Sequence, residues 1–398
     1  MMETFLNVLE KTLIWFFSLA FGIVLIYGAV RYNHRQAHES DPWVAAQKQH
    51  SIEGYLNFLK QCRGCPMQAK ARTALDELQR PAGMVSRLGT EHLPERASIT
   101  QAVFSPDAEA VLALGGRGPD FWESMTGRRS SFGEKSFAGG VRATALDYAP
   151  DGHRIGVGVP GVKGGGRLMV WDLTSESLIA THEVEASEVR AVMFSPDGRW
   201  LGWSGDGPVG MWDPVGGLFL RMTHEGATSI AFRRGNENSA VFLTAGGREL
   251  WVWDPATMER LKEQHLDSDY PLLGLSRDGR VIAFTDGAVL DLWDTETTKP
   301  LASLRDLEGR IVSFCRETTS GRIVIGTDTG MIHVWNPAGS ALPIGRVAAH
   351  QGPVEALACG SLGRVVSSGW DGAKVWDLAV IAMGTTPEKS PSVAHKHP

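Results

Sequence analysis

The chain has 398 residues, of which 43% are hydrophobic and 21% are charged, and its formal net charge is −6. This composition is that of a folded protein rather than a disordered one, and the acidic balance argues against a general nucleic-acid-binding protein. The 46 glycines and 13 tryptophans favour short strands joined by tight turns. With only four cysteines we expect no disulfide framework, and therefore a fold that depends on its apolar core.

After an N-terminal flank over residues 1–11, the chain contains nineteen consecutive uncharged residues, 12–30. As a helix this segment is about 28 Å long, which matches the hydrocarbon thickness of a bilayer. It lacks the polar stripe of a buried core helix, and it lacks the basic start and short apolar run of a cleaved signal peptide. The sequence therefore predicts one retained transmembrane helix over residues 12–30.

The charges on either side of this segment predict its orientation. Lys11 precedes it, whereas Arg31 and Arg35 follow it closely, and Lys48 comes later. Lys and Arg near the ends of a transmembrane helix favour the cytoplasmic side, so we expect a cell-membrane protein with its C-terminal bulk in the cytoplasm. The opposite orientation, with the bulk exported, is the alternative.

Residues 31–50 are predicted to be a juxtamembrane linker, and residues 51–82 a helical hairpin. Its two segments, "SIEGYLNFLKQ" and "PMQAKARTALDELQ", repeat apolar residues at helical spacing. The pair resembles the tetratricopeptide-like hairpins of many bacterial proteins. The positions expected on the apolar faces are Ile52, Tyr55, Leu56, Leu59, Met67, Ala71, Ala74, Leu75 and Leu78.

The turn of this hairpin contains "CRGC", which has two interpretations. Cys62 and Cys65 could form a disulfide or redox pair, because a thiol just before a helix has a lowered pKa. Alternatively they are two small residues that fill a turn. Pro66 stands where a haem-attachment motif needs His, and no further zinc ligands follow at a suitable spacing.

A Trp-centred motif, as in "LMVWDLTSESL" and "LWVWDPATMERL", recurs seven times in the remaining chain. The intervals between successive tryptophans are 49, 41, 41, 40, 42 and 41 residues. Several units also contain an apolar strand, a Ser-Pro-Asp-Gly type of turn and a second strand. The recurring tryptophans are Trp122, Trp171, Trp212, Trp253, Trp293, Trp335 and Trp376.

These units resemble WD-repeat β-propeller blades, which have this period and four strands each. The resemblance implies an all-β fold with a seven-bladed propeller over residues 83–384, in which each Trp lies on a third strand and packs against a neighbouring blade. Residues 385–398 are polar and are predicted to be a disordered tail, so the seventh blade needs an outer strand from elsewhere. We expect Met84–Leu88 to supply it and so to close the ring.

In well-formed WD repeats a His, a Ser or Thr, and a turn Asp are hydrogen-bonded towards the Trp. By this resemblance His350, Ser367 (or Ser368), Asp371 and Trp376 form such a network in the seventh unit, although Asp371 is one residue closer to the Trp than usual. The other units mostly lack the set. In the third, Asp206 has the usual spacing but Glu185 occupies the His position, and the turns near His224 and His265 offer no matching Asp.

The chain contains no recognisable catalytic motif, and we expect no cofactor and no metal site. The Gly-rich "VPGVKGGGRL" runs into a strand rather than a helix, which favours a rim loop over a phosphate-binding loop. The histidines named above, His224, His265 and His350, are accordingly interpreted as structural rather than catalytic.

The resulting functional hypothesis is a membrane-tethered scaffold whose propeller holds partner proteins, as WD-repeat propellers generally do. Trp203 and Trp370 are candidate exposed anchors for a partner, with packing between blades as the other interpretation. The alternatives are an exported envelope sensor or assembly factor, and a propeller enzyme with a funnel-shaped active site.

Overall fold

The computed structural model describes residues 42–62, 65–88, 99–115, 118–130, 142–161, 165–206, 208–222, 224, 227–234 and 240–383. The chain divides into two compact units, residues 1–80 and 81–398. The predicted transmembrane segment and the C-terminal tail lie outside the described residues. Within the described part of the chain, no helix is both long and apolar enough to span a bilayer.

The first unit is a small helical domain with its own apolar centre. Ser51 begins its second helix, because its hydroxyl accepts a hydrogen bond from the Gly54 amide at 3.0 Å. Tyr55 and Phe58 are buried, whereas Ile52 and Leu56 are exposed, so the apolar face is rotated relative to the predicted one. The helices are α2 (Pro42–Gln49), α3 (Ile52–Gln61) and α4 (Gln68–Leu78).

Two of these helices correspond to the hairpin expected over residues 51–82. The third, α2, lies where a linker was expected, and that expectation was wrong. Trp43 explains the difference, since its ring lies 5.3 Å from the ring of Phe58 and 6.1 Å from that of Tyr55, which joins α2 to the apolar centre of the unit.

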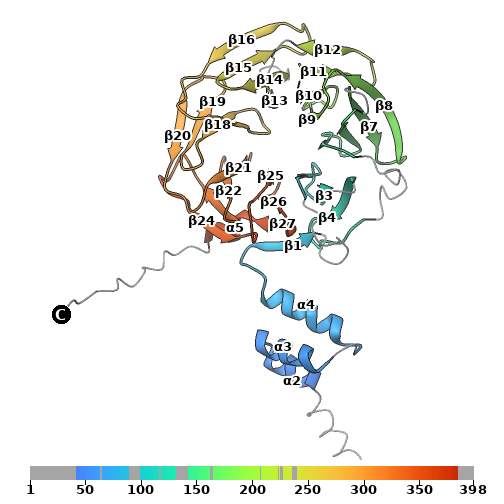
Figure 1. Cartoon of the computed structure of the whole chain (residues 1–398), viewed down its shortest axis with the longest axis vertical. Coiled ribbons are helices and arrows are strands. Elements are labelled where there is room, and N and C mark those ends of the chain that lie inside the picture. Colours follow the sequence, from blue (N-terminus) through green and yellow to red (C-terminus); the bar gives the residue numbers. More distant parts are fainter. Residues whose placement is uncertain are drawn as a thin grey trace, which may run out of the picture. The chain divides into compact units, whose positions relative to one another are not determined.

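The second unit is a ring of seven antiparallel sheets, seen face-on in Figure 1, where the chain runs round the ring in sequence order. Blade 1 contains β2 (Gln101–Phe104), β3 (Ala110–Gly115) and β4 (Gly118–Glu123). Blade 2 contains β5 (Ala145–Tyr148), β6 (Arg154–Val159), β7 (Gly166–Asp172) and β8 (Ser177–Val184). Blade 3 contains β9 (Val189–Phe194), β10 (Leu201–Gly205), β11 (Val209–Trp212) and β12 (Phe219–Met222).

The remaining blades follow the same order, from the inner strand to the outer strand. Blade 4 contains β13 (Ser229–Arg234), β14 (Ala240–Gly246), β15 (Glu249–Trp253) and β16 (Arg260–His265). Blade 5 contains β17 (Leu272–Leu275), β18 (Val281–Thr285), β19 (Leu290–Asp294) and β20 (Pro300–Leu304). Blade 6 contains β21 (Ile311–Arg316), β22 (Ile323–Thr327), β23 (Met331–Trp335) and β24 (Gly345–Ala348).

Blade 7 closes the ring with a strand from the other end of the sequence. Its inner three strands are β25 (Ala356–Cys359), β26 (Arg364–Gly369) and β27 (Gly372–Asp377), and its outer strand is β1 (Met84–Leu88). β1 pairs antiparallel with β27, with Met84 opposite Trp376 and Leu88 opposite Ala373. The predicted closing strand is therefore confirmed, with the same bounds. A short helix, α5 (Leu378–Met383), follows β27.

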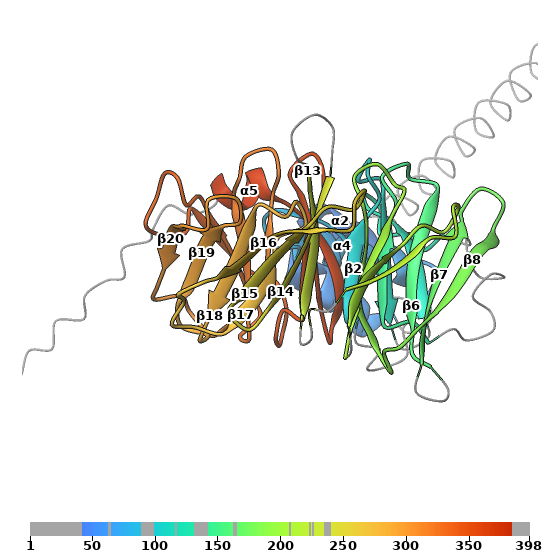
Figure 2. The same cartoon turned by 90° about the horizontal axis from the view of Figure 1, so that it is seen from above.

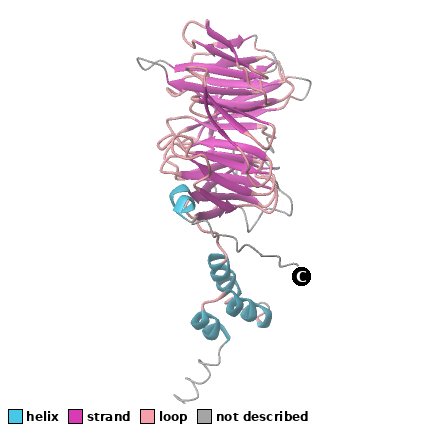
Figure 3. Ribbon diagram, turned by 90° about the vertical axis from the view of Figure 1, so that its left-hand side faces the viewer, coloured by secondary structure: helices cyan, strands magenta, loops and turns pink. Residues whose placement is uncertain are grey.

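The apolar core of the ring consists of seven clusters in the described residues, one at each junction between neighbouring blades. All seven recurring tryptophans lie on third strands, and each belongs to the cluster between its own blade and the preceding blade. Burying both faces of every sheet in this way is what a single blade cannot do alone. Figures 2 and 3 show the strands crossing the thickness of the disc.

This geometry gives the disc two faces that bear different turns. We call the face formed by the turns between second and third strands the 370 face, after Trp370 in the turn between β26 and β27. The turns between first and second strands form the opposite face, where they surround the end of the central channel. We call this channel end the axial mouth.

Candidate functional site

The hydrogen-bond network predicted for the seventh blade is present in the structure. The His350 Nε2 and the Trp376 Nε1 both lie within hydrogen-bond distance of the Ser367 hydroxyl, at 2.7 and 2.8 Å. The His350 Nδ1 contacts the Asp371 carboxylate. Ser367, rather than Ser368, is the hydroxyl that joins the indole to the imidazole. This chain of contacts connects the core of blade 7 to its turn on the 370 face.

Lys374 completes this network, a role that the resemblance to WD repeats did not imply. Its ammonium lies 2.8 Å from the second oxygen of Asp371 and also bonds the Ala349 carbonyl. Burial alone would raise the pKa of Asp371, but the hydrogen bonds from His350 and Lys374 outweigh it and hold that pKa well below its usual range. The carboxylate is therefore ionised and fully engaged, so it serves to fix the turn.

Trp370 lies beside this anchored turn, and 49% of its surface is exposed. A Cβ at Gly352 would collide with its indole, so the glycine allows the ring to lie against the neighbouring backbone. Trp370 is thus an aromatic side chain displayed on a rigid support. A shallow depression of about 330 Å³ opens on the same face between blades 5 and 6, and Val312, which is 38% exposed, contributes to its wall.

The interpretation of Trp203 as an exposed anchor was wrong. It lies in β10, the second strand of blade 3, and only 1% of its surface is exposed. Its ring stacks on Phe219 with centroids 6.1 Å apart. Gly202 beside it is required because the Phe242 ring of blade 4 packs against that position. At Gly202, therefore, the neighbouring blade approaches the backbone closely.

Blade 4 contains a shortened form of the same network, which was not predicted from the sequence. The His224 Nδ1 lies 2.6 Å from the Thr244 hydroxyl, which also accepts a hydrogen bond from the Trp253 indole at 3.1 Å. No Asp takes part. Thr244 could have been recognised, because it stands nine residues before its Trp, as Ser367 does in blade 7. Burial lowers the pKa of His224 and favours the neutral imidazole.

The other residues singled out in the sequence have local roles. His265 contacts Glu249 at 2.7 Å on the outer strand of blade 4. Asp206 accepts a hydrogen bond from the Ser187 hydroxyl, which ties the turn of blade 3 to the loop before β9. The centre of the Gly-rich loop, residues 162–164, lies outside the described residues.

All four cysteines are paired in the structure. Cys62 and Cys65 form a disulfide in the turn between α3 and α4. Cys315 and Cys359 form a second one, with their Cα atoms 5.7 Å apart, which cross-links the inner strands of blades 6 and 7. The expectation that the ring depends on apolar packing alone was therefore incomplete, because one covalent link joins the last two blades.

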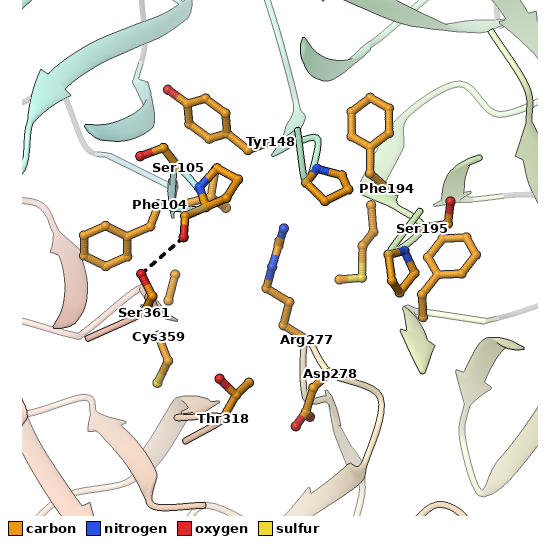
Figure 4. Close-up of a pocket in the computed structure, with 18 of the residues that line it drawn as sticks. Phe104, Ser105, Tyr148, Phe194, Ser195, Arg277, Asp278, Thr318, Cys359 and Ser361 are labelled. Atoms are coloured by element: carbon orange, nitrogen blue, oxygen red, sulfur yellow. Dashed lines mark hydrogen bonds between the residues drawn. The ribbon is translucent and has the colours of Figure 1, made fainter. Parts of the chain in front are cut away.

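The axial mouth holds a cavity of about 630 Å³, shown in Figure 4. Its walls come from the inner strands and turns of all seven blades, and they include the aromatic rings of Phe104, Tyr148 and Phe194. Arg277, in the turn of blade 5, projects into the middle of this cavity.

Arg277 makes an ion pair with Asp147, which lies on the inner strand of blade 2 and is 1% exposed. The second oxygen of this carboxylate accepts a hydrogen bond from the Phe194 amide at 2.9 Å. Burial raises the pKa of Asp147, and the guanidinium acts in the opposite direction. The pair links two blades on opposite sides of the ring (Figure 1).

This pair was not predicted from the sequence, although two departures from the repeat pattern mark its residues. Arg277 replaces the proline found in the corresponding turns, at Pro106, Pro150 and Pro196. Asp147 stands where the inner strands of blades 1 and 3 carry apolar residues. Each residue departs from the pattern of the other repeats, and their opposite charges are the signal from which an ion pair could have been predicted.

At the cavity, Asp278 is paired with Arg316 just as Asp147 is with Arg277. Across the described residues, no group of three or more His, Cys, Asp or Glu side chains is placed to hold a metal ion.

Comparison with known proteins gives one relevant likeness. No family model matches the chain. The chain is 22% identical over 246 residues to the guanine nucleotide-binding protein subunit beta of Saccharomyces cerevisiae, a match that covers 60% of this chain and 56% of that protein. The chain thus spans little more than half the length of this relative. Together with the seven blades and their recurring tryptophans, this likeness supports placing the chain among the WD-repeat propellers.

Proposed function

We propose that this protein is a scaffold that holds a partner protein on the 370 face of its propeller, and that its N-terminal segment tethers the propeller to a membrane. The propeller fold and the likeness to a G-protein beta subunit support an interaction scaffold. The observation that carries the choice of face is the half-exposed Trp370 beside the network around Asp371.

The physical argument concerns the cost of ordering a contact residue. Binding a flexible side chain loses conformational entropy, of the order of 0.5–1.5 kcal/mol. The turn that carries Trp370 is already fixed by Asp371, which bonds both His350 and Lys374. An aromatic residue held in this way contributes large contact area at low entropic cost, as binding hot spots do.

Site-specific photo-cross-linking tests this proposal in cells. With p-benzoylphenylalanine at position 370, we expect a cross-linked species of discrete mass. The same probe at position 362 is the matched control, because Leu362 is 81% exposed in the same blade but lies in a turn on the opposite face. Equal cross-linking at both positions, or none at 370, would contradict the assignment of the face. The Trp370→Ala variant, which carries no probe, should keep its melting temperature, and less of the partner identified by cross-linking should co-purify with it.

The membrane tether is supported by the length of the uncharged segment 12–30. Replacing Phe21 and Val24 by Arg costs about 2.5–3.5 kcal/mol per residue at the centre of a bilayer. We therefore expect alkaline carbonate to extract the double variant from membranes but to leave the unaltered chain behind. Extraction of both proteins alike would refute the tether without affecting the proposed binding face.

A second candidate, an exported sensor or assembly factor, is favoured by the two disulfides. Every cysteine of the chain is paired, and disulfides persist mainly in oxidising compartments outside the cytoplasm. The excess of Lys and Arg after residue 30, which favours the cytoplasm, is small. We give the disulfides more weight and propose that the propeller faces the oxidising side.

Thiol labelling of intact cells distinguishes the two orientations. If the propeller is exported, a membrane-permeable alkylating reagent leaves all four cysteines unmodified until a reductant is added. Labelling without reductant, at Cys315 and Cys359 in particular, would place the propeller in the cytoplasm. A reporter enzyme fused after Pro398 provides an independent readout of the side.

A further inference from the structure

The axial mouth contains an arrangement that the scaffold function does not use. Its cavity of about 630 Å³ has the size of a small-molecule site. Three arginines from blades 4 and 5 line it, Arg234, Arg277 and Arg280, against one aspartate, Asp278. The side chains that line the cavity therefore carry an excess of positive charge, in a chain whose formal net charge is −6.

The ion pairs at the cavity leave two of its three guanidinium groups without a carboxylate partner among the described residues. Asp278 is neutralised by Arg316, and Arg277 is neutralised by Asp147. Arg234 and Arg280 are exposed, and neither forms an ion pair with any described residue. Two like charges on one low-dielectric cavity attract anions strongly, since the walls focus the field into the opening.

Arg277 places hydrogen-bond donors at the centre of this field. A guanidinium carries five N–H groups in a planar fork, and the contact with Asp147 is made by Nη1 alone. Its side chain is 48% exposed, so other donors face the cavity. In Figure 4 it extends between the Tyr148 and Phe194 walls. This fork matches the two oxygens of a carboxylate.

The walls of the cavity are largely apolar, and they indicate the chemistry of the part of the ligand that lies beside its charged group. Phe104, Phe194 and Phe232 contribute rings, and Pro106, Pro150 and Pro196 contribute rigid turns. Such walls favour a ligand that buries an aliphatic or aromatic body beside its charge. A multiply charged anion such as phosphate would leave these surfaces unused.

We propose that the axial mouth binds a carboxylate borne on a small apolar body, with Arg277 holding the carboxylate and Arg234 and Arg280 drawing it in. Asp147 then competes with the ligand for the same guanidinium. This site lies on the face opposite Trp370, so it is separate from the proposed partner surface.

Calorimetric titration of the full chain with N-acetyl-L-phenylalanine tests the proposal. We expect saturable binding, no binding of the neutral N-acetyl-L-phenylalaninamide, and none of inorganic phosphate. The variant Arg234→Gln/Arg280→Gln breaks no ion pair with a described residue and should bind at least fivefold more weakly. Asp147→Asn should bind severalfold more tightly, because it releases Arg277 while retaining an oxygen for the Phe194 amide.

Arg248→Gln is the matched control, because Arg248 is an exposed arginine in the turn between β14 and β15, on the 370 face. Its affinity should equal that of the unaltered chain. Equal binding of acid and amide would overturn the proposal, as would weaker binding by Asp147→Asn with an unchanged melting temperature. A ten-residue peptide that ends in phenylalanine shows whether the bound carboxylate belongs to the C-terminus of a polypeptide or to a free small molecule. Tighter binding than N-acetyl-L-phenylalanine assigns the site to chain ends, and weaker binding assigns it to free metabolites.

Discussion

Arg277 of blade 5 donates a hydrogen bond to the buried carboxylate of Asp147 of blade 2, so that one ion pair connects opposite sides of the ring. The arginine lies half in solvent and the aspartate does not. The contact therefore neutralises a charge that the interior could not otherwise hold. Among the residues that the structure describes, the other side-chain hydrogen bonds and ion pairs between blades join neighbouring blades, whereas this pair joins blades that are not neighbours.

Arg277→Met should lower the free energy of unfolding by about 3 kcal/mol, because it leaves the Asp147 carboxylate buried and unpaired. Chemical denaturation at neutral pH measures the change. The double variant Arg277→Met/Asp147→Leu should regain part of the loss, since an apolar pair replaces the ionic one. Arg221→Met is the control, because Arg221 pairs with Glu185 at the surface, where a pair contributes at most about 1 kcal/mol. Equal effects of the two arginine variants would contradict the argument.

Leu88→Ala should destabilise the propeller by about 2–4 kcal/mol, because Leu88 is fully buried in the strand that closes the ring. Leu301→Ala alters another outer strand, β20, at a position that is 52% exposed, and should change stability by less than about 0.5 kcal/mol. Deleting residues 83–90 should lower the melting temperature further than either. An unchanged melting curve after the deletion would show that β1 does not close the ring.

Acidification from pH 7 to 5 should destabilise the propeller partly through His224. Burial lowers the pKa of this imidazole below its ordinary value of 6.5, so the unfolded chain takes up a proton before the folded one does. Its contribution is therefore complete above about pH 6.5 and is lost as the pH falls through the lowered pKa. His224→Gln should be less stable than the unaltered chain at pH 7 and should lose less on acidification. Parallel stability curves for the two proteins between pH 7 and 5 would contradict this.

Removing the cross-link between blades 6 and 7 by Cys315→Ser/Cys359→Ser should destabilise the propeller by up to about 4 kcal/mol, because the bond closes a long loop in the unfolded chain. Differential scanning calorimetry without reductant measures the effect. Cys62→Ser/Cys65→Ser is the control, since that pair lies in the other unit and should leave the propeller transition where it is. If both double variants melt alike, the second disulfide does not contribute to the ring.

The repeat architecture was predictable because the Trp-centred motif recurs in the sequence at nearly regular intervals. Once the tryptophan period set seven units, the seventh lacked an outer strand, and Met84–Leu88 was a segment without a blade of its own. Pairing the two requires no knowledge of side-chain packing. The blade 7 network was accessible for the same reason, since His350 and Asp371 occupy positions that the repeat defines.

Contacts that depend on the closed ring could not be predicted in this way. Arg277 and Asp147 are 130 residues apart, and only the curvature of the complete disc brings them together. Trp203 was a candidate exposed anchor, with packing between blades as the other interpretation, and it is buried beside Gly202, which makes room for Phe242 of the next blade. Periodicity locates the strands, but the side-chain contacts between one blade and the next are seen only in the three-dimensional structure.

The origin of the closing strand also has a consequence for biosynthesis. β1 leaves the ribosome before any blade, while its partner β27 is among the last parts of the propeller to be translated. Early blades can collapse in turn, but the first and last cannot be joined until translation is nearly complete. During that interval the edge of β1 is unpaired and is exposed to aggregation or to capture by a chaperone.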